Sequence, residues 1–342
     1  MRSVLVTGGA GFIGSNFVRH LLASYDYQIV NLDKLTYAGN LDNLRDVQDN
    51  PRYRFVQGDI CDSELVGGLM AEVDAVVSFA AESHVDRSLE DPGAFIQTDV
   101  FGTYVLLEAA RQANVERFLH ISTDEVYGQS LADQRFTESA PFRPRSPYAA
   151  SKAGGELQCH AFLETYGLPI IVARPANNIG PSQYPEKAVP LFVTNALDDQ
   201  PLPVYGQGLQ VRDRLYVDDH CEALDLLLHR GEVGEAYNIS ADNERTNLDV
   251  AETILELLEK PKSLIRFVED RQGHDQRYHM DSQKMRALGW SPRHDFAAAI
   301  EKTVAWYRDN RGWWEKIKAG EYQEYYQRMY SRRLAEARPY KR

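Results

Sequence analysis

The chain has 342 residues, and 38 Lys and Arg against 50 Asp and Glu give a formal net charge of −12. This length predicts one large domain or two closely joined ones, with a core that needs no disulfide or metal for stability. A hydrophobic fraction of 43% and a charged fraction of 26% exclude disorder as the main state. The acidic balance argues against a basic nucleic-acid-binding surface, so no nucleic acid is expected as a partner.

Cysteine usage and the first residues indicate the compartment. The three cysteines, Cys61, Cys159 and Cys221, have no C-x-x-C spacing, so neither a metal site nor a disulfide framework is expected. No signal-peptide pattern precedes the first apolar run at Val4–Val6. The longest apolar runs fall short of the roughly 20 residues of a membrane span. We expect a cytoplasmic protein with no membrane partner.

Short apolar runs alternate with amphipathic patterns through the first half of the chain. The apolar runs lack polar alternation, as in strands buried on both faces. They predict strands at Val4–Val6, Gln28–Leu32, Tyr53–Gln57, Ala75–Phe79, Phe118–Ile121 and Ile170–Ala173. Helices are predicted at Phe12–Ala23, Phe95–Ala113 and Tyr148–Tyr166. Alternating strands and helices indicate an α/β fold with a doubly wound parallel Rossmann sheet.

A glycine-rich run, Gly8–Gly14, follows the first predicted strand and opens the first predicted helix. Its G-x-G-x-x-G spacing permits a tight turn, close approach of the main chain to a pyrophosphate, and a helix N-terminus facing that charge. Asp33 follows the second strand, where an acid binds ribose hydroxyls and repels the 2′-phosphate of NADP. NAD is therefore the expected cofactor. The alternative is an ordinary tight turn with a surface Asp.

Thr123, Asp124 and Glu125 follow the predicted strand Phe118–Ile121, at the sheet edge where ligands bind in such folds. A solvated turn is the ordinary alternative for adjacent carboxylates. At a strand end, the two can instead be held in different environments, one protonated as an acid and the other ionised as a base. Thr123 is expected to hydrogen-bond a substrate oxygen.

Tyr148 and Lys152 are four residues apart on a predicted helix that Ser146 caps, so their side chains share one face. A nearby ammonium is expected to lower the pKa of Tyr148 from its ordinary value of about 10 and make it a usable base. An exposed helical pair is the alternative for this spacing alone. Because this pair follows a predicted dinucleotide-binding site in the chain, we interpret Tyr148 and Lys152 as catalytic.

The pattern changes after Arg174, where a turn-rich run begins. Helices are predicted at Asp219–Leu228, Asn247–Leu258 and Phe296–Arg308. We expect residues 1–174, completed by part of 209–240, to form an NAD-binding Rossmann domain. Residues 175–342 are expected to form a smaller mixed α/β substrate-binding lobe and a C-terminal tail. We expect the tail aromatics to pack as core: Trp313, Trp314, Tyr322, Tyr325, Tyr326 and Tyr330.

Together these residues resemble the extended short-chain dehydrogenase/reductase superfamily and, within it, the dTDP-glucose 4,6-dehydratase family. The resemblance covers nearly the whole chain. Its most specific part is Thr123–Glu125, because the related sugar-nucleotide epimerases carry small hydroxyl residues there. Other matching segments are Thr7–Gly14, Asp33–Asn40, Asp59-Ile60, Ala80–Ser88, Tyr148–Lys152, Pro185–Lys187, Val211–Asp213 and Gly273–Asp275.

The resemblance implies a lyase of nucleotide sugar metabolism and deoxysugar biosynthesis. It would dehydrate dTDP-glucose to dTDP-4-keto-6-deoxyglucose, with NAD as cofactor. Tyr148 would take the 4-hydroxyl proton as hydride leaves C4, and Lys152 would hold the nicotinamide ribose. Glu125 would remove the C5 proton and Asp124 would protonate the departing 6-hydroxyl, before hydride returns to C6. A homodimer through the helices Phe95–Ala113 and Tyr148–Tyr166 is also implied.

The resemblance further implies cofactor contacts at Gly8, Gly11, Phe12, Ile13, Gly14, Asp33, Lys34, Thr36, Asp59, Ile60, Ala81, Ser83, Thr98, Tyr148, Lys152 and Asn178. It implies contacts to the nucleotide-diphosphate sugar at His84, Thr123, Asn177, Glu186, Lys187, Arg212, Asn247 and His274. Arg212 is expected to clamp the diphosphate, since a guanidinium meets phosphate oxygens in pairs. The alternative for Arg212 is a surface salt bridge with Asp213 or a nearby acid.

Two residues depart from the family pattern, and both flank expected substrate residues. Ile179 stands where the family has Tyr, and Arg214 stands where it has Trp. They leave open UDP-glucose or another NDP-hexose as the substrate. An NDP-sugar 4-epimerase or decarboxylase of the same superfamily, and a non-catalytic NAD-binding sensor or scaffold, remain as alternative functions.

Overall fold

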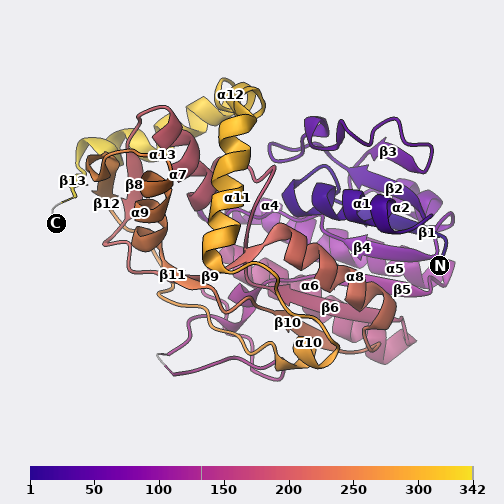
Figure 1. Ribbon diagram of the computed structural model, residues 1–342. Helices are drawn as coiled ribbons and strands as arrows, with labels where there is room; N and C mark the ends of the chain where they lie inside the picture. The colour runs from indigo at the N-terminus through magenta and orange to yellow at the C-terminus, as the bar shows by residue number, and fades with distance from the viewer. Residues whose placement is uncertain (132, 341–342) are drawn as a thin grey trace.

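The computed structural model describes residues 1–131 and 133–340. A parallel sheet with its flanking helices makes up most of the first half of the chain (Figure 1). Within the described residues the sheet has seven strands, in the order β10-β6-β5-β4-β1-β2-β3. Their bounds are β1 Ser3–Thr7, β2 Gln28–Asp33, β3 Tyr53–Gln57, β4 Ala75–Ser78, β5 Arg117–Ile121, β6 Ile170–Pro175 and β10 Ala236–Ile239. Strand order reverses at β1, which pairs with β2 and β4, so a ligand crevice is expected at their carboxyl ends.

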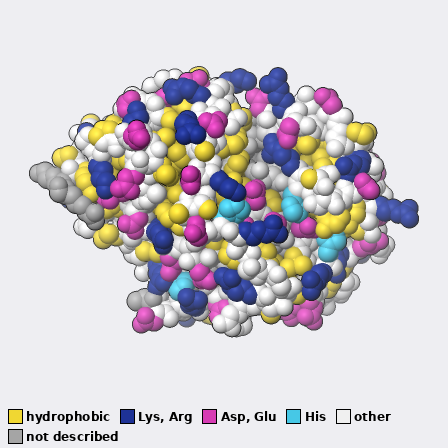
Figure 2. Space-filling view, viewed as in Figure 1, with side chains coloured by type: hydrophobic (Ala, Val, Ile, Leu, Met, Phe, Trp, Pro, Cys, Tyr) yellow, Lys and Arg dark blue, Asp and Glu magenta, His cyan; other side chains and the backbone are white. Residues whose placement is uncertain are grey.

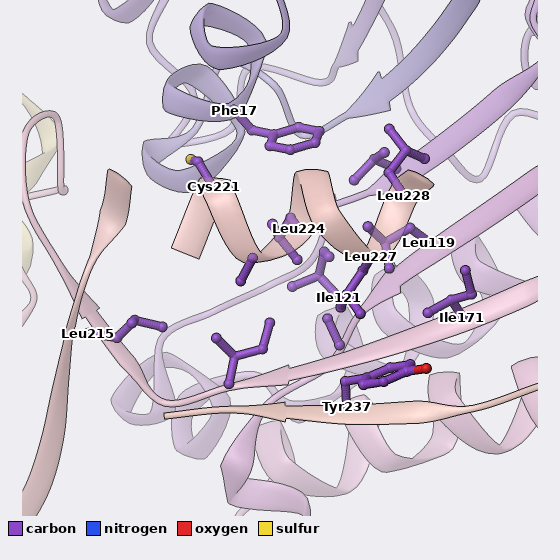
Figure 3. Packing of buried hydrophobic residues seen from close by; sticks show 14 of the residues in the cluster. Phe17, Leu119, Ile121, Ile171, Leu215, Cys221, Leu224, Leu227, Leu228 and Tyr237 are labelled. Carbon is purple, nitrogen blue, oxygen red and sulfur yellow. The ribbon is translucent and has the colours of Figure 1, made fainter. Parts of the chain in front are cut away.

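Helices cover both faces of this sheet, which confirms the doubly wound α/β fold. Val4 and Val6 of β1 lie in one apolar cluster, whereas Leu5 lies in another, because successive strand side chains point to opposite faces. Figure 3 shows the first cluster, where Phe17 and Leu224 gather with strand residues. Its helices are α1 Phe12–Ser24 and α8 Val217–Arg230, and those of the second cluster are α2 Ser63–Met70, α5 Thr103–Ala113 and α6 Pro147–Tyr166.

The single helix predicted at Phe95–Ala113 is wrong in its first part. The chain instead forms α3 Val85–Glu90, α4 Pro92–Phe95, a π-helical segment η2 Ile96–Gly102, and then α5. A Cβ at Gly155 of α6 would lie 2.5 Å from the main-chain oxygen of Asp99, so η2 and α6 pack with their backbones close together. The Asp99 carboxylate accepts hydrogen bonds from Glu82 N and Ser151 Oγ. The spacing of hydrophobic residues does not reveal close packing and hydrogen bonds between segments that are distant in the sequence.

A smaller mixed α/β lobe follows, as expected. Its sheets, in the described residues, are β11-β9-β7 and β13-β12-β8. The strands are β7 Asn177–Ile179, β8 Leu202–Tyr205, β9 Val211–Tyr216, β11 Glu244–Thr246, β12 Ile265–Val268 and β13 Arg338–Pro339. The helices are α7 Ala188–Leu197, α9 Asn247–Leu257, α10 Gln283–Ala287, α11 Phe296–Asp309, α12 Arg311–Lys318 and α13 Glu321–Ala335. Short 3₁₀ turns are η1 Leu41–Leu44, η3 Asp124–Tyr127 and η4 Lys262–Leu264.

The C-terminal tail packs on this lobe through its aromatic side chains. Trp314, Tyr322, Tyr325 and Tyr330 are buried, which confirms their predicted packing. Tyr330 also lines a cavity of the lobe, so the tail contributes to a binding wall that the sequence did not predict. No helix in the described residues has the length and apolarity needed to cross a bilayer. Figure 2 shows Lys and Arg interspersed with Asp and Glu across the face in view.

Candidate active site

A cavity of about 310 Å³ opens at the carboxyl ends of the central strands. All sixteen residues expected to contact the cofactor line it. Thr123, Asp124 and Glu125 line the same cavity, so the structure brings the glycine run, the acid pair and the Tyr148–Lys152 pair to one place. These segments are far apart in the sequence, and the parallel sheet is what aligns their ends.

The glycine run shapes one wall of this cavity by close packing. Gly8 has a φ of +71°, and a Cβ there would lie 2.6 Å from the main-chain nitrogen of Ala80. A Cβ at Gly14 would lie 2.3 Å from the carbonyl oxygen of Gly8. The N-cap of α1, Gly11, has no side chain to cap the helix. The first-turn N–H groups therefore suit a pyrophosphate, which fits NAD.

Asp33 ends β2 at the far side of the glycine run. Its Oδ2 accepts a hydrogen bond from Ala10 N at 2.9 Å, and its Oδ1 accepts one from Leu35 N at 2.8 Å. Burial raises the pKa of this carboxyl, and the two main-chain donors oppose that effect. Lys34 forms an ion pair with Asp59 at 2.6 Å. The carboxyl ends of β2 and β3 thus hold two carboxylates, Asp33 and Asp59, where ribose hydroxyls are expected.

Tyr148 and Lys152 both project from the first turns of α6, which Ser146 caps through a hydrogen bond from Ala149 N to Ser146 Oγ. The expected lowering of the pKa of Tyr148 by Lys152 is wrong for the polypeptide alone. Burial, followed by the negative charge of Glu125, raises the pKa of Tyr148 well above 10. Lys152 donates to the carbonyl of Ile121 at 2.7 Å, and a hydrogen bond between Tyr148 and the Thr123 side chain opposes part of the rise in the tyrosine pKa.

The adjacent acids occupy a buried 3₁₀ turn, η3, capped by Thr123. Burial and then the charge of Glu125 raise the pKa of Asp124 to about 8. Thr123 donates to Asp124 Oδ1 at 3.1 Å, and the hydroxyl of Tyr278 lies 3.3 Å from Glu125 Oε2. Asp124 is thus protonated at neutral pH, whereas Glu125 faces the hydroxyl of Tyr278, which also lies 2.9 Å from Asp275 Oδ2.

A second cavity, of about 150 Å³, lies between the sheet and the smaller lobe. It is lined by His84, Asn177, Glu186, Lys187, Arg212, Asn247 and His274, which are all the expected substrate residues except Thr123. Glu125, Asn177 and Lys187 line both cavities, so the two meet at the acid pair. A ligand in the second cavity can therefore present a reacting carbon to groups in the first.

Arg212 is buried and makes no bridge to Asp213. Its Nη1 and Nη2 donate to the carbonyl oxygens of Val211 and Asp275, each at 2.8 Å. Its guanidinium carbon lies 4.2 Å from the centroid of the Tyr278 ring. Asp213 instead accepts hydrogen bonds from residues 240–243. The surface-bridge alternative is therefore wrong, and Arg212 keeps a buried charge beside the cavity.

Other expected contact residues already have protein partners. Glu186 accepts a hydrogen bond from Arg87 at 2.9 Å, and Lys187 donates to the carbonyl of Ser83. His274 lies 2.6 Å from Asp270, and burial lowers its pKa to about 4. Asn178 contacts His220 at 3.0 Å. These contacts fix side chains at the cavity walls.

Sequence reasoning missed several residues at this site. Asp99 lies in the predicted helix, yet it is buried and hydrogen-bonded beside Lys152. Arg271 lines the second cavity and lies 3.7 Å from Asp86. Tyr205 and Tyr330 complete that wall. No spacing in the sequence indicates these residues, although Arg271 precedes the matching segment Gly273–Asp275 by two positions.

Comparison with known proteins identifies the family. The family described as GDP-mannose 4,6 dehydratase matches residues 5–303. A dTDP-glucose 4,6-dehydratase from Neisseria meningitidis serogroup B is 51% identical over 94% of this chain and 98% of that protein. The chain belongs to the dTDP-glucose 4,6-dehydratase family. The expected family and superfamily are thereby confirmed.

Solved structures of this family and its superfamily share the fold. DesIV, a dTDP-glucose 4,6-dehydratase from Streptomyces venezuelae with NAD and TYD bound, has a TM-score of 0.91 and 50% identity, covering 92% of this chain and 100% of that one. A UDP-glucose 4-epimerase from Thermus thermophilus in complex with NAD has a TM-score of 0.84 and 34% identity, covering 90% and 99%. The fold is common to dehydratases and epimerases, so the site must decide between them.

Proposed function

We propose that the protein is an NAD-dependent dTDP-glucose 4,6-dehydratase that forms dTDP-4-keto-6-deoxyglucose. One observation carries this proposal. Two adjacent buried acids differ in environment, and Asp124 has a pKa of about 8 beside Glu125. Elimination of water needs an acid at the leaving hydroxyl and a base at the neighbouring carbon. A 4-epimerase performs no elimination and has no use for this pair.

The walls of the first cavity fit NAD. The backbone of the glycine run lies where any Cβ at Gly8 or Gly14 would clash, and the start of α1 offers unpaired N–H groups. Asp33 stands where an acid disfavours NADP. Bound NAD would supply the hydride acceptor for C4 and, once reduced, the hydride donor for C6.

The residues of the chain would then move the protons. Once ionised, Tyr148 would take the proton of the sugar 4-hydroxyl, which becomes the 4-ketone as hydride leaves C4. Burial and the charge of Glu125 raise the pKa of Tyr148 in the polypeptide alone, so the positive charge of bound NAD would have to favour the phenolate. The ketone acidifies the C5 proton, which Glu125 removes. Asp124 gives its proton to the 6-hydroxyl, which leaves as water, and Glu125 returns a proton to C5 when C6 receives hydride. The hydride removed at C4 would return at C6, so the reaction would consume no external reductant.

The second cavity supports a nucleotide-diphosphate sugar as the substrate. Its walls carry Arg212 and Lys187, whose cationic groups hydrogen-bond to neutral carbonyls and can meet phosphate oxygens. We assign the base as thymine because relatives at about half identity are dTDP-glucose dehydratases. UDP-glucose or another NDP-hexose is the alternative substrate, since Ile179 and Arg214 line this cavity.

A product assay tests the proposal. The protein is incubated with dTDP-, UDP-, CDP- and GDP-glucose, and the alkaline absorbance of a 4-keto sugar is followed. A C6 methyl signal by NMR separates dehydration from epimerisation. We expect product with dTDP-glucose, and none with the Tyr148→Phe control. Absence of product from every substrate would overturn the proposal, and faster turnover of UDP-glucose would reassign the base.

We also propose that the enzyme is a cytoplasmic homodimer that packs through η2, α5 and α6. Phe101, Tyr104, Leu157 and Tyr166 expose 42–57% of their surface along these helices. An exposed apolar patch of this kind is typical of an interaction surface. Free cysteines are compatible with a reducing compartment. Light scattering should give a dimer that Leu157→Asp dissociates, whereas the control Leu257→Asp, on α9, leaves it intact.

A further inference from the structure

Strand β9 presents two arginines to the second cavity. Arg212 and Arg214 are two residues apart, so their side chains leave the same face of the strand. Both line the second cavity, and Arg214 lies opposite Asn177 in the β7 register. Asp213, which points the other way, binds the 240–243 segment. Figure 1 places β9 at the junction of the central sheet and the smaller lobe.

Arg214 is a buried cation that the protein leaves incompletely satisfied. It is 5% exposed, and Nη2 donates to Asn247 Oδ1 at 2.7 Å. Its Nε is buried without a hydrogen-bond partner. Within the described residues it forms no ion pair, and burial followed by the charge of Arg212 lowers its pKa to about 10. The guanidinium is therefore charged at neutral pH, and burying such a charge is costly unless an anion joins it.

The other charges around the cavity narrow the identity of that anion. Arg271 pairs with Asp86, and Glu186 pairs with Arg87. Arg212, Arg214 and Lys187 instead hydrogen-bond to neutral carbonyl or amide oxygens. Glu125 lines the same cavity and offsets part of this charge, but a ligand with a single carboxylate would still leave these cations incompletely balanced. A diphosphate carries several negative oxygens that two guanidinium groups can bind in pairs.

Arg214 also determines the orientation of Asn247, the first residue of α9. Its hydrogen bond occupies the Oδ1 atom of Asn247. The amide must therefore keep its Nδ2 hydrogens, which are donors, available for another acceptor. Arg214 thus supplies its own donors and fixes those of a neighbour at the same cavity.

We propose that Arg214 adds a second guanidinium to the diphosphate contact already expected of Arg212, and that Arg214 also positions Asn247. This inference rests on the proposed function for the identity of the ligand. It makes Arg214, which replaces the Trp of the family pattern, a diphosphate-binding residue particular to this chain. With two arginines at the diphosphate, this group should contribute more to the binding affinity for the nucleotide sugar than it would with Arg212 alone.

Calorimetric binding to the NAD-loaded full chain tests this inference. The probes are dTDP, UDP and dTMP, and the variant is Arg214→Met, which keeps the length of the side chain and removes its charge. We expect dTDP and UDP to bind at least about tenfold more weakly, and dTMP to lose less, because charged hydrogen bonds to the second phosphate are missing. Arg214→Lys, which keeps the charge without the planar fork, should lie between.

Arg245 provides a matched control on the neighbouring strand. It pairs with Arg212 in the β11–β9 register, is exposed, and lies outside the cavity lining. Arg245→Met should therefore leave all three affinities within about twofold. The thermal midpoint (Tm) measured without nucleotide distinguishes a binding role of Arg214 from a structural one. Removal of an unsatisfied buried charge should not lower the Tm of Arg214→Met, whereas loss of a structural contact would lower it.

Three results would overturn the inference. They are unchanged dTDP affinity in Arg214→Met, equal losses of affinity for dTDP and dTMP, or a lower Tm with binding intact.

In turnover, the variant should raise KM for dTDP-glucose with kcat changed by less than about threefold, because the proton-transfer residues remain. The binding result does not depend on turnover. An inactive wild type that binds dTDP through Arg214 would refute the proposed function and leave this inference standing.

Discussion

Asp124 is buried directly beside Glu125, and burial together with this neighbouring carboxylate raises the pKa of Asp124 to about 8. The proton therefore stays on Asp124 under neutral conditions. Consecutive residues thus hold an acid and a candidate base in one cavity, which also contains Tyr148 and Lys152. This arrangement allows the roles of individual groups to be tested by substitution and by pH.

The protonated state of Asp124 predicts that the pH–activity profile has a basic limb, in which activity falls as the pH rises. The group must be protonated to serve as an acid, so kcat should fall as the pH rises through about 8. Asp124→Asn should reduce kcat by about 10²–10⁴ and remove this limb, because an amide donates a hydrogen bond but gives up no proton. Intact binding of dTDP is the control. A wild-type profile flat to pH 10, or an active asparagine variant, would contradict the assignment.

Glu125→Gln should separate oxidation from elimination. The variant keeps Tyr148 and should reduce its bound cofactor, which gives the near-ultraviolet absorbance of NADH in a single turnover. Elimination should then stall, because glutamine cannot take the C5 proton. Tyr148→Phe is the matched comparison and should give no such absorbance. If Glu125→Gln binds substrate yet accumulates no NADH, Glu125 acts before elimination.

The raised pKa of Asp99 predicts that activity falls at acidic pH. Burial raises its pKa to about 6, and the ionised carboxylate in turn supports the charged form of Lys152. Activity should decline as the pH falls through about 6, and Asp99→Asn should lack that limb. Because the folded pKa exceeds the unfolded one, the wild type should lose stability relative to Asp99→Asn as pH rises from about 4 to 6. Denaturant unfolding at both pH values measures this, and parallel stabilities would be the contrary result.

The buried pair of Arg174 and Glu156 predicts a stability effect away from the chemistry. The side chains are 7% and 6% exposed, and the guanidinium also donates to the carbonyl of Glu138 at 2.8 Å. Glu156→Ala would strand a buried positive charge and should lower the free energy of unfolding by about 3–5 kcal/mol. The exposed pair of Glu108 and Arg111 is the matched control, and Glu108→Ala should change little. Equal effects would show that burial is not the cause.

Local sequence determined the elements that touch their own neighbours. Gly8–Gly14 predicted its turn and helix because the spacing of glycines reflects backbone crowding that is local to the first βα unit. The helix carrying Tyr148 and Lys152 was likewise predicted from its cap and periodicity, and it begins one residue earlier than expected. The π-helical segment Ile96–Gly102 was not, because its cause is contact with α6, about fifty residues away in the chain.

The sequence alone determined the fold class and the expected cofactor, and it supplied the candidate acid–base residues, because each depends on residue type at short spacing. Only the tertiary structure decided their electrostatics. The pKa of Tyr148 rises rather than falls because burial and the charge of Glu125 outweigh the hydrogen bond with Thr123. Arg214, noted in the sequence only as a departure, becomes a buried cation beside Arg212 because β9 folds over the cavity. Desolvation depends on every element around a group, and no spacing along one chain records it.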